Sequence, residues 1–392
     1  MRHIFNTLTA VCLCGLCAVS CIYPFEAKVS DADSRIVIDG DILIGSETTV
    51  SLGYMWSLSA FDEEMVWNTP LGNVWVEDDR GDVYENETKV PSEGASSFTI
   101  DTRLAPTDRQ YRLHFKDYGT DREYVSSWTS VNPAPVIDGI GYELDDDNVN
   151  MTLSAHSDDG GQYFRWTYDE LWKYHAEYAP DYEFDTKEQV EVLRDQPDES
   201  LYYCWGSNSS KEVDLCATAD LSANRLKDHK FLAIDRSNQR MMIRYRINVS
   251  LRCISADAYR YLYNLKITSN YTGSLFSPNP SDVVGNITCL DDPDENVIGY
   301  IDVCRTVSKM FYIDQRTAMC YKAPASTGYL FIPPADEDGV VDLMSFWRSG
   351  YVPIMYGLDT ATGESGVLWD YKRCIDCRTS GGTLTMPEDW EE

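Results

Sequence analysis

Positive charge and histidine are both scarce in this sequence. Its 392 residues hold 33 Lys and Arg against 64 Asp and Glu, with five His, so the formal net charge is −31 at pH 7. Repulsion from phosphate groups argues against a nucleic-acid partner and against peripheral binding to anionic lipid headgroups. Attachment to a membrane would therefore need a covalent or hydrophobic anchor.

Short catalytic motifs are also missing. The sequence has no His-Glu-x-x-His zinc motif and no Gly-x-Ser-x-Gly nucleophile turn. Beyond the first 20 residues the histidines are His114, His156, His175 and His229, which lie far apart and suit core or surface positions. We therefore predict no catalytic residue, no metal site and no cofactor, with a hydrolase of unrecognised site as an alternative.

Long apolar runs are absent except at the N-terminus. Leu8–Val19 has about half the length that a helix needs to cross a bilayer, and it follows Arg2, as in a signal peptide. Small residues precede Cys21, as in a bacterial lipobox. We expect residues 1–20 to be removed and Cys21 to carry lipid, with an ordinary signal peptide as the alternative. Several acyl chains, such as palmitate, on one residue anchor a protein stably.

Cysteine does not recur after Cys21 until the second half of the chain. The eight remaining cysteines are Cys204, Cys216, Cys253, Cys289, Cys304, Cys320, Cys374 and Cys377. An even number in an exported protein favours disulfides, up to four, whose pairing the sequence does not determine. A zinc site would need a second CxxC or a nearby His pair beside Cys374-Ile375-Asp376-Cys377. We predict that this CxxC staples a C-terminal loop.

Short alternating segments are abundant. Ile36–Ile38 and Ile42–Ile44 have the periodicity of short strands, with Asp39-Gly40-Asp41 between them as a turn. Comparable segments follow at 49–52, 73–77, 97–100, 110–115, 123–128, 136–142, 149–155 and 163–168. Their spacing predicts a mainly β chain of tandem β-sandwiches, similar to immunoglobulin or fibronectin-III domains.

Pro133 and Pro135 interrupt this pattern and indicate a domain boundary. We expect four parts: a lipoprotein signal peptide at 1–20, an N-terminal β-sandwich at 21–132, a second Ig-like sandwich with insertions at 133–314, and a cysteine-tied C-terminal extension at 315–392 packed on the second sandwich.

The pattern changes twice within the second part. Residues 243–251 alternate apolar and polar side chains, as in a half-buried strand. We expect one or two short helices, one of them capped by Ser255 with Asp257 in its first turn. From Gly273 the chain is rich in Pro and Asn and is predicted to be loop until a strand at Val297–Cys304.

The second sandwich also contains an aromatic-rich segment with Trp166, Tyr168, Trp172 and Tyr174. Such side chains stack on sugar rings or seat a partner protein. In a sandwich, however, tryptophan is normally part of the core. Both interpretations stay open, and the ligand is unknown.

Several motifs follow one another along the mature chain. They are Pro24-Phe25 after Cys21, Ile36-Val37-Ile38-Asp39-Gly40, Tyr111-Arg112-Leu113, Phe164-Arg165-Trp166, Cys204-Trp205, residues 255–261, Gly273-Ser274-Leu275-Phe276, Gly285-Asn286-Ile287, Val297-Ile298-Gly299-Tyr300, Cys374-Ile375-Asp376-Cys377, Gly381-Gly382, Pro387 and Trp390. Together they resemble the DUF4249 family of Bacteroidetes envelope lipoproteins. The resemblance implies a lipoprotein with sandwich-like domains, from a family whose genes often lie beside TonB-dependent outer-membrane receptors, and it implies no established activity.

These observations lead to one expectation about function. We expect a non-enzymatic accessory or binding lipoprotein, anchored to the outer membrane by its N-terminal lipid and working with a TonB-dependent transporter. A structural or adhesive surface lipoprotein is the first alternative, and an envelope hydrolase is the second. The first acid after Cys21 is Glu26 rather than an adjacent residue, so periplasmic and surface-facing orientations both stay open.

Overall fold

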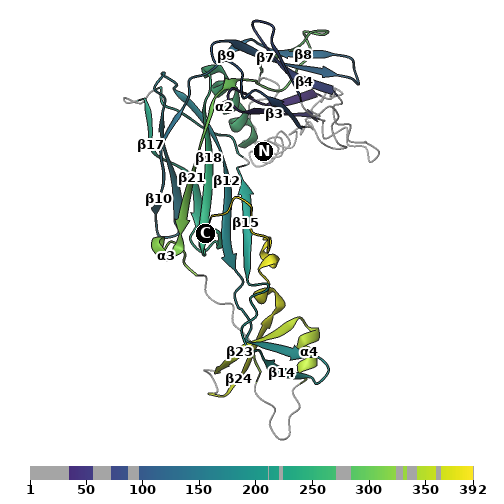
Figure 1. Ribbon diagram of the computed structural model, residues 1–392, viewed down its shortest axis with the longest axis vertical. Coiled ribbons are helices and arrows are strands. Elements are labelled where there is room, and N and C mark those ends of the chain that lie inside the picture. The colour runs from purple at the N-terminus through teal and green to yellow at the C-terminus, as the bar shows by residue number, and fades with distance from the viewer. Residues whose placement is uncertain are drawn as a thin grey trace, which may run out of the picture.

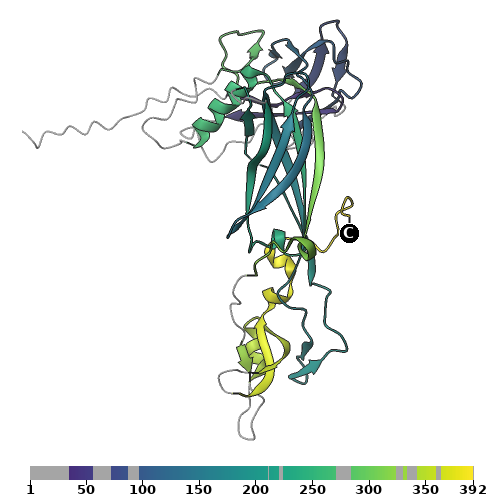
Figure 2. The same ribbon diagram turned by 90° about the vertical axis from the view of Figure 1, so that its left-hand side faces the viewer.

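The computed structural model describes residues 35–55, 72–86, 97–210, 212–219, 224–270, 284–323, 330–332, 342–358 and 363–391. Strands dominate these residues, which confirms the predicted mainly β fold class. They form three lobes in a row, here called the N-terminal lobe, the central sandwich and the distal lobe (Figures 1 and 2). Among the described residues, no helix has both the length and the hydrophobicity to cross a bilayer.

Two sheets form the N-terminal lobe. One sheet has the order β1 (Arg35–Gly40), β3 (Glu47–Met55), β6 (Ser97–Asp101). The other has the order β19 (Ile287–Cys289), β8 (Glu123–Ser126), β7 (Gln110–Asp117), β4 (Gly72–Asp78), β5 (Val83–Glu85), and β9 (Thr129–Ser130) pairs with β7. Alternate residues of these strands point inward, so Val50, Phe98 and Phe115 are buried in one core between the sheets.

Residues 284–304 belong to this lobe, although the sequence assigned them to the second domain. β19 pairs antiparallel with β8, inside a stretch predicted to be loop. The strand expected at Val297–Cys304 is reduced to β20 (Val303–Cys304), which pairs parallel with β2 (Ile42–Leu43). Ile298 lies beside β1, exchanging backbone hydrogen bonds of 2.8 and 2.9 Å with Ile38 and Ile36. The strands that residues 284–304 pair with lie far away in the sequence, so the local sequence pattern does not reveal this pairing.

The central sandwich packs two antiparallel sheets face to face. The first has the order β10 (Val136–Leu144), β11 (Asn148–His156), β17 (Arg225–Asp235). The second has the order β15 (Tyr203–Ser209), β12 (Tyr163–His175), β18 (Arg244–Cys253), β21 (Thr306–Asp314), and β16 (Asp214–Ala217) pairs with β12. In β18 the predicted alternation buries Tyr245, Ile247, Val249 and Leu251 completely. A 3₁₀ turn at Gln239–Met241 (η2) precedes β18, and the short helix α3 (Gln315–Ala318) follows β21.

The distal lobe is built from two distant parts of the chain. The hairpin of β13 (Tyr182–Asp185) and β14 (Val190–Leu193) packs against a sheet of order β22 (Leu330–Ile332), β24 (Ser365–Tyr371), β23 (Tyr351–Leu358), with α4 (Leu343–Arg348) beside it. Phe184 and Trp369 meet edge to face in its small core, with ring centroids 5.5 Å apart. Residues 182–193 therefore pack with the C-terminal part of the chain and not with the second sandwich, inside which the sequence placed them.

The end of the chain returns to the central sandwich. Two 3₁₀ turns, η4 (Lys372–Ile375) and η5 (Cys377–Ser380), follow β24. A disulfide joins Cys377 to Cys204 in β15, and the Tyr174 hydroxyl donates a hydrogen bond of 2.8 Å to the Cys377 carbonyl oxygen. The other candidate disulfide cysteines, Cys216, Cys253, Cys289, Cys304, Cys320 and Cys374, are free thiols.

A buried ion triad holds the N-terminal lobe on the central sandwich. Asp41, between β1 and β2, accepts hydrogen bonds from Arg165 at 3.0 Å and Arg252 at 2.6 Å. The two arginines are direct partners on β12 and β18. All three side chains are largely shielded from water, with exposed fractions of 4%, 16% and 13%. The triad therefore fixes how these lobes meet.

Candidate functional site

A cleft of about 700 Å³ opens where the N-terminal lobe meets the central sandwich. Its walls come from three segments: the β8–β9 connection, the helix α2 (Ala256–Asn270), and the stretch around Gly285 and Tyr300. The lining is mainly polar and includes Gln110, Ser127, Trp128, Thr129, Ser130, Asp257, Arg260, Tyr261, Asn264 and Asn286. Such a mixture of hydrogen-bonding groups and aromatic rings suits a polar ligand.

Helix α2 presents its polar face to the cleft. The Ser255 hydroxyl accepts a hydrogen bond of 3.1 Å from the Ala258 backbone N–H, so it caps the helix as expected from the sequence. Ala258 and Leu262 are buried and fix one face of the helix on the protein. Asp257, Arg260 and Asn264 recur at helical spacing on the opposite side. The Arg260 guanidinium lies 3.0 Å from the Asp257 carboxylate, which orients both side chains.

A buried carboxylate fixes the start of this helix. Asp302 is completely buried and accepts hydrogen bonds from the backbone N–H groups of Ser255, at 2.7 Å, and Val303, at 3.0 Å. Burial raises the pKa of Asp302 to about 6, and the neighbouring negative charge of Asp41 acts in the same direction. One side chain thus links the helix start to the backbone beside the ion triad.

The opposite wall carries an exposed tryptophan. Trp128 is 40% exposed, and the Arg112 guanidinium carbon lies 4.5 Å from the centroid of its ring. Such a cation–π contact holds the indole in place while leaving part of it open to solvent. The backbone of Ser127 donates a hydrogen bond of 2.8 Å to the Asn286 carbonyl oxygen, joining this wall to the third segment.

The third segment needs glycine. A Cβ on Gly285 would stand 1.7 Å from the carbonyl oxygen of Gly299, which no side chain tolerates. The Asn286 side chain then exchanges two hydrogen bonds of 2.8 Å with the backbone of Ile301. The close approach and these two bonds keep the segment rigid at the edge of the cleft.

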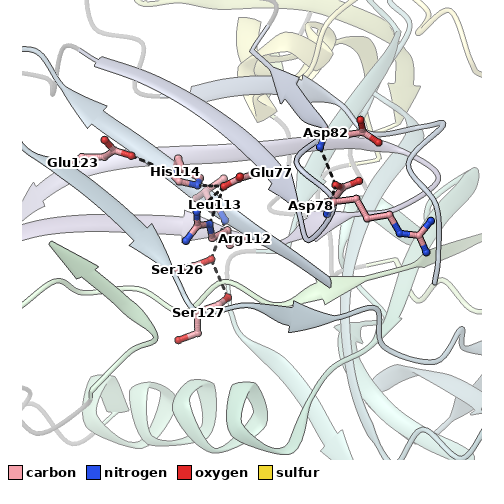
Figure 3. Close-up of polar contacts among 10 residues, drawn as sticks. Glu77, Asp78, Asp82, Arg112, Leu113, His114, Glu123, Ser126 and Ser127 are labelled. Carbon is pink, nitrogen blue, oxygen red and sulfur yellow. Dashed lines mark hydrogen bonds and ion pairs between the residues drawn. The ribbon is translucent and has the colours of Figure 1, made fainter. Parts of the chain in front are cut away.

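A polar cluster on strands β4, β7 and β8 positions Arg112, the cation–π partner of Trp128. Figure 3 shows this cluster. Glu77 accepts hydrogen bonds from Arg112 at 2.7 and 3.0 Å, and it lies 2.9 Å from His114 Nε2, while Glu123 lies 3.0 Å from Nδ1. Burial by itself raises the pKa of Glu77, but the hydrogen bonds from Arg112 and His114 outweigh it and hold the pKa below its ordinary value. The Trp75 ring stacks on His114, with centroids 4.8 Å apart. His114 therefore supports the wall rather than opening into the cleft.

Polar side chains of the same strands also hold the backbone in place. The Ser126 hydroxyl accepts a hydrogen bond of 2.9 Å from the Leu113 N–H and donates one of 3.3 Å to the Ser127 carbonyl oxygen (Figure 3). At the far end of β4, Asp78 accepts hydrogen bonds of 3.0 Å from the backbone of Asp82 and Arg80, closing the turn to β5. These contacts are structural.

The residues singled out from the sequence lie elsewhere. Cys21 and residues 1–20, the predicted signal peptide, fall outside the described residues. Trp166, Trp172 and Tyr174 are buried, with exposed fractions of 2%, 7% and 1%, so they form core and not a ligand surface. Tyr168 is half-buried and packs on Phe231, with ring centroids 5.7 Å apart. The structure brings none of these four aromatic residues to the cleft.

Sequence reasoning did not identify Trp128, Arg260 or Asn264 as site residues. The helix pattern carried a partial signal, because Asp257, Arg260 and Asn264 share one polar face. Nothing in the sequence indicates that this face meets Trp128, which lies more than 100 positions earlier and belongs to another lobe.

Comparisons with known proteins identify the family and offer only distant structural likeness. The family model described as "Domain of unknown function (DUF4249)" matches residues 22–310. A search of curated proteins found no match. The crystal structure of chicken CNTN1 FN1-FN3 domains aligns at 13% identity and a TM-score of 0.19, over 56% of this chain and 62% of that chain, so this chain spans less than two thirds of its length. The Biofilm associated protein B domain aligns at 7% identity and a TM-score of 0.14, over 72% of this chain and 87% of that chain.

Proposed function

The chain belongs to the DUF4249 family, and from this premise we propose that it is a lipid-anchored envelope protein that binds a polar nutrient for a TonB-dependent transporter of the outer membrane. The observation that carries the binding role is the polar cleft between the N-terminal lobe and helix α2. Its volume of about 700 Å³ lies in the range of pockets that bury small ligands.

The anchoring part of the proposal rests on the sequence. Arg35, where β1 begins, lies 14 positions after Cys21, and a chain of that length spans at most about 50 Å. Because β1 belongs to the N-terminal lobe, a lipid on Cys21 keeps the cleft within reach of proteins in the same membrane. The distal lobe lies at the opposite end of the molecule (Figure 2).

The lining supports binding rather than hydrolysis. Among the described residues that line the cleft, Asp257 is the one carboxylic acid, and it is paired with Arg260. Glycoside hydrolysis normally uses two facing carboxyl groups, and acyl transfer needs a nucleophile with an adjacent base. A purely adhesive role would be expected to use a flat surface, whereas this face is hollowed.

The same lining favours an oligosaccharide over an apolar ligand. An exposed indole offers a face for a sugar ring, while Arg260, Asp257 and Ser130 offer donors and acceptors for hydroxyl groups. The mature chain is strongly acidic, which disfavours polyanionic ligands at long range.

A ligand screen on the mature chain with Cys21→Ala tests the cleft. We expect at least one neutral oligosaccharide from a defined panel to bind in isothermal titration, and Trp128→Ala and Arg260→Ala each to weaken it about tenfold or more. Tyr263→Ala serves as control, because Tyr263 is an exposed aromatic residue of α2 that does not line the cleft. Unchanged affinity in both cleft variants, or binding by short peptides alone, would contradict an oligosaccharide site here.

A further inference from the structure

A second group of side chains lies at the junction between the central sandwich and the distal lobe. Glu177 follows the end of β12, Asp370 lies in β24, and Cys374 lies in η4. Their ligand atoms, two carboxylate oxygens and one sulfur, all lie within 4.8 Å of one another. The Tyr178 backbone N–H also donates a hydrogen bond of 3.0 Å to the Cys374 carbonyl oxygen, which holds the two segments together.

Asp370 is incompletely satisfied at this junction. It is 4% exposed, and its Oδ1 accepts a hydrogen bond of 2.7 Å from the Tyr371 backbone N–H. Its Oδ2 is also buried, yet it has no hydrogen-bond partner within the part of the chain that the structure describes. A buried carboxylate oxygen without a partner is costly, and the neighbouring Cys374 thiol is only a weak donor, so a cation would stabilise this oxygen.

The cysteine of the group is available as a ligand. Cys374 is 8% exposed and forms no disulfide, since its CxxC neighbour Cys377 is bonded to Cys204. Its sulfur lies beside the carboxylates of Asp370 and Glu177. A divalent cation binds a thiolate and two carboxylates at once and releases the thiol proton to solvent.

One thiolate and two carboxylates at this spacing select among the common metals. Mg²⁺ and Ca²⁺ prefer sites made of oxygen alone, whereas Zn²⁺ accepts sulfur and oxygen in a tetrahedron. Zn–S and Zn–O distances of about 2.3 and 2.0 Å place tetrahedral ligand atoms about 3.3 to 3.5 Å apart. The ligand atoms must therefore move roughly 1 Å closer to one another. Glu177 is exposed, so its side chain can make that movement.

We propose that Glu177, Asp370 and Cys374 bind one Zn²⁺, with water as fourth ligand, and that this ion ties the distal lobe to the central sandwich. The sequence did not predict the site because its ligands come from segments almost 200 residues apart and from one half of a CxxC. The site is remote from the cleft, and it stands whether or not the cleft binds a nutrient.

Metal titration of the mature chain with Cys21→Ala and its disulfide intact tests this site. We expect one equivalent of Zn²⁺ to bind in competition with a chelating dye, and Co²⁺ in its place to give the near-ultraviolet absorption of a sulfur-to-cobalt bond. Asp370→Asn and Cys374→Ser should each weaken Zn²⁺ binding about 100-fold or more. Cys216 is a partly exposed free thiol in β16, so the Cys216→Ser variant should bind Zn²⁺ as tightly as the parent does.

Folding of the variants is checked by circular dichroism without metal. If Asp370→Asn or Cys374→Ser fails to fold, Glu177→Gln decides the question, because Glu177 is exposed and its loss should weaken binding about tenfold without unfolding the chain. Zn²⁺ should also slow backbone hydrogen exchange at residues 176–178 and 370–376. The proposal would be overturned if the parent bound no Zn²⁺, if all three ligand variants bound Zn²⁺ as tightly as the parent, or if the cobalt spectrum lacked the sulfur band.

Discussion

Replacement of both Cys204 and Cys377 by alanine is expected to lower the free energy of unfolding by about 4 to 5 kcal/mol. The disulfide spans 173 residues of sequence, and in the chain-entropy model closing so long a loop removes much of the freedom of the unfolded chain. The bond also holds η5 against β15, next to the hydrogen bond between Tyr174 and Cys377. Denaturant unfolding of the double variant and the parent measures the difference.

The control for this prediction is Cys216→Ala, which removes a free and partly exposed thiol. It should stay within about 1 kcal/mol of the parent. A double variant that unfolds as late as this control would show that the disulfide adds nothing to stability. Reduction of the parent should reproduce the effect of the double variant, since both open the same loop.

The ion triad between the lobes gives the second large effect. Asp41→Ala should destabilise the chain by about 3 to 5 kcal/mol, because it leaves Arg165 and Arg252 side by side, largely buried and without their carboxylate. Both cationic groups then repel each other at the junction. The contact between the N-terminal lobe and the central sandwich should weaken, and ligand affinity at the cleft should fall as a result.

Asp39→Asn is the matched control, because Asp39 lies two positions before Asp41, near the end of β1, but is exposed. It should change the free energy of unfolding by no more than about 0.5 kcal/mol. Denaturant unfolding compares the two variants, and hydrogen exchange at β2 and β20 reports on the junction itself. Equal stability of the two variants would contradict a role of the triad in holding the lobes together.

The local alternation of apolar and polar residues was sufficient to predict most of the strands. The alternation at Ile36–Ile38, at 149–155 and in β18 is dictated by burial of every second side chain, and each of these segments is a strand in the structure. The helix after Ser255 followed from its cap and apolar spacing in the same way. Such features depend on neighbours in the sequence, so they can be predicted from it.

Features that depend on distant partners were not predicted. β19 becomes a strand because β8 offers it an edge, and the distal lobe exists because the β13–β14 hairpin meets β24. The disulfide partner of Cys204 is likewise set by the path of the whole chain. The cleft combines three such distant segments, which is why Trp128 and Arg260 were not recognised as one site.

The most direct test of the proposed role is recovery of the tagged chain from native membranes in mild detergent, followed by mass spectrometry of the proteins that accompany it. We expect a TonB-dependent receptor to accompany the parent in near-stoichiometric amount and to be lost or strongly reduced for Cys21→Ala. Recovery of the parent without any such receptor, or from the soluble fraction, would contradict the proposed role.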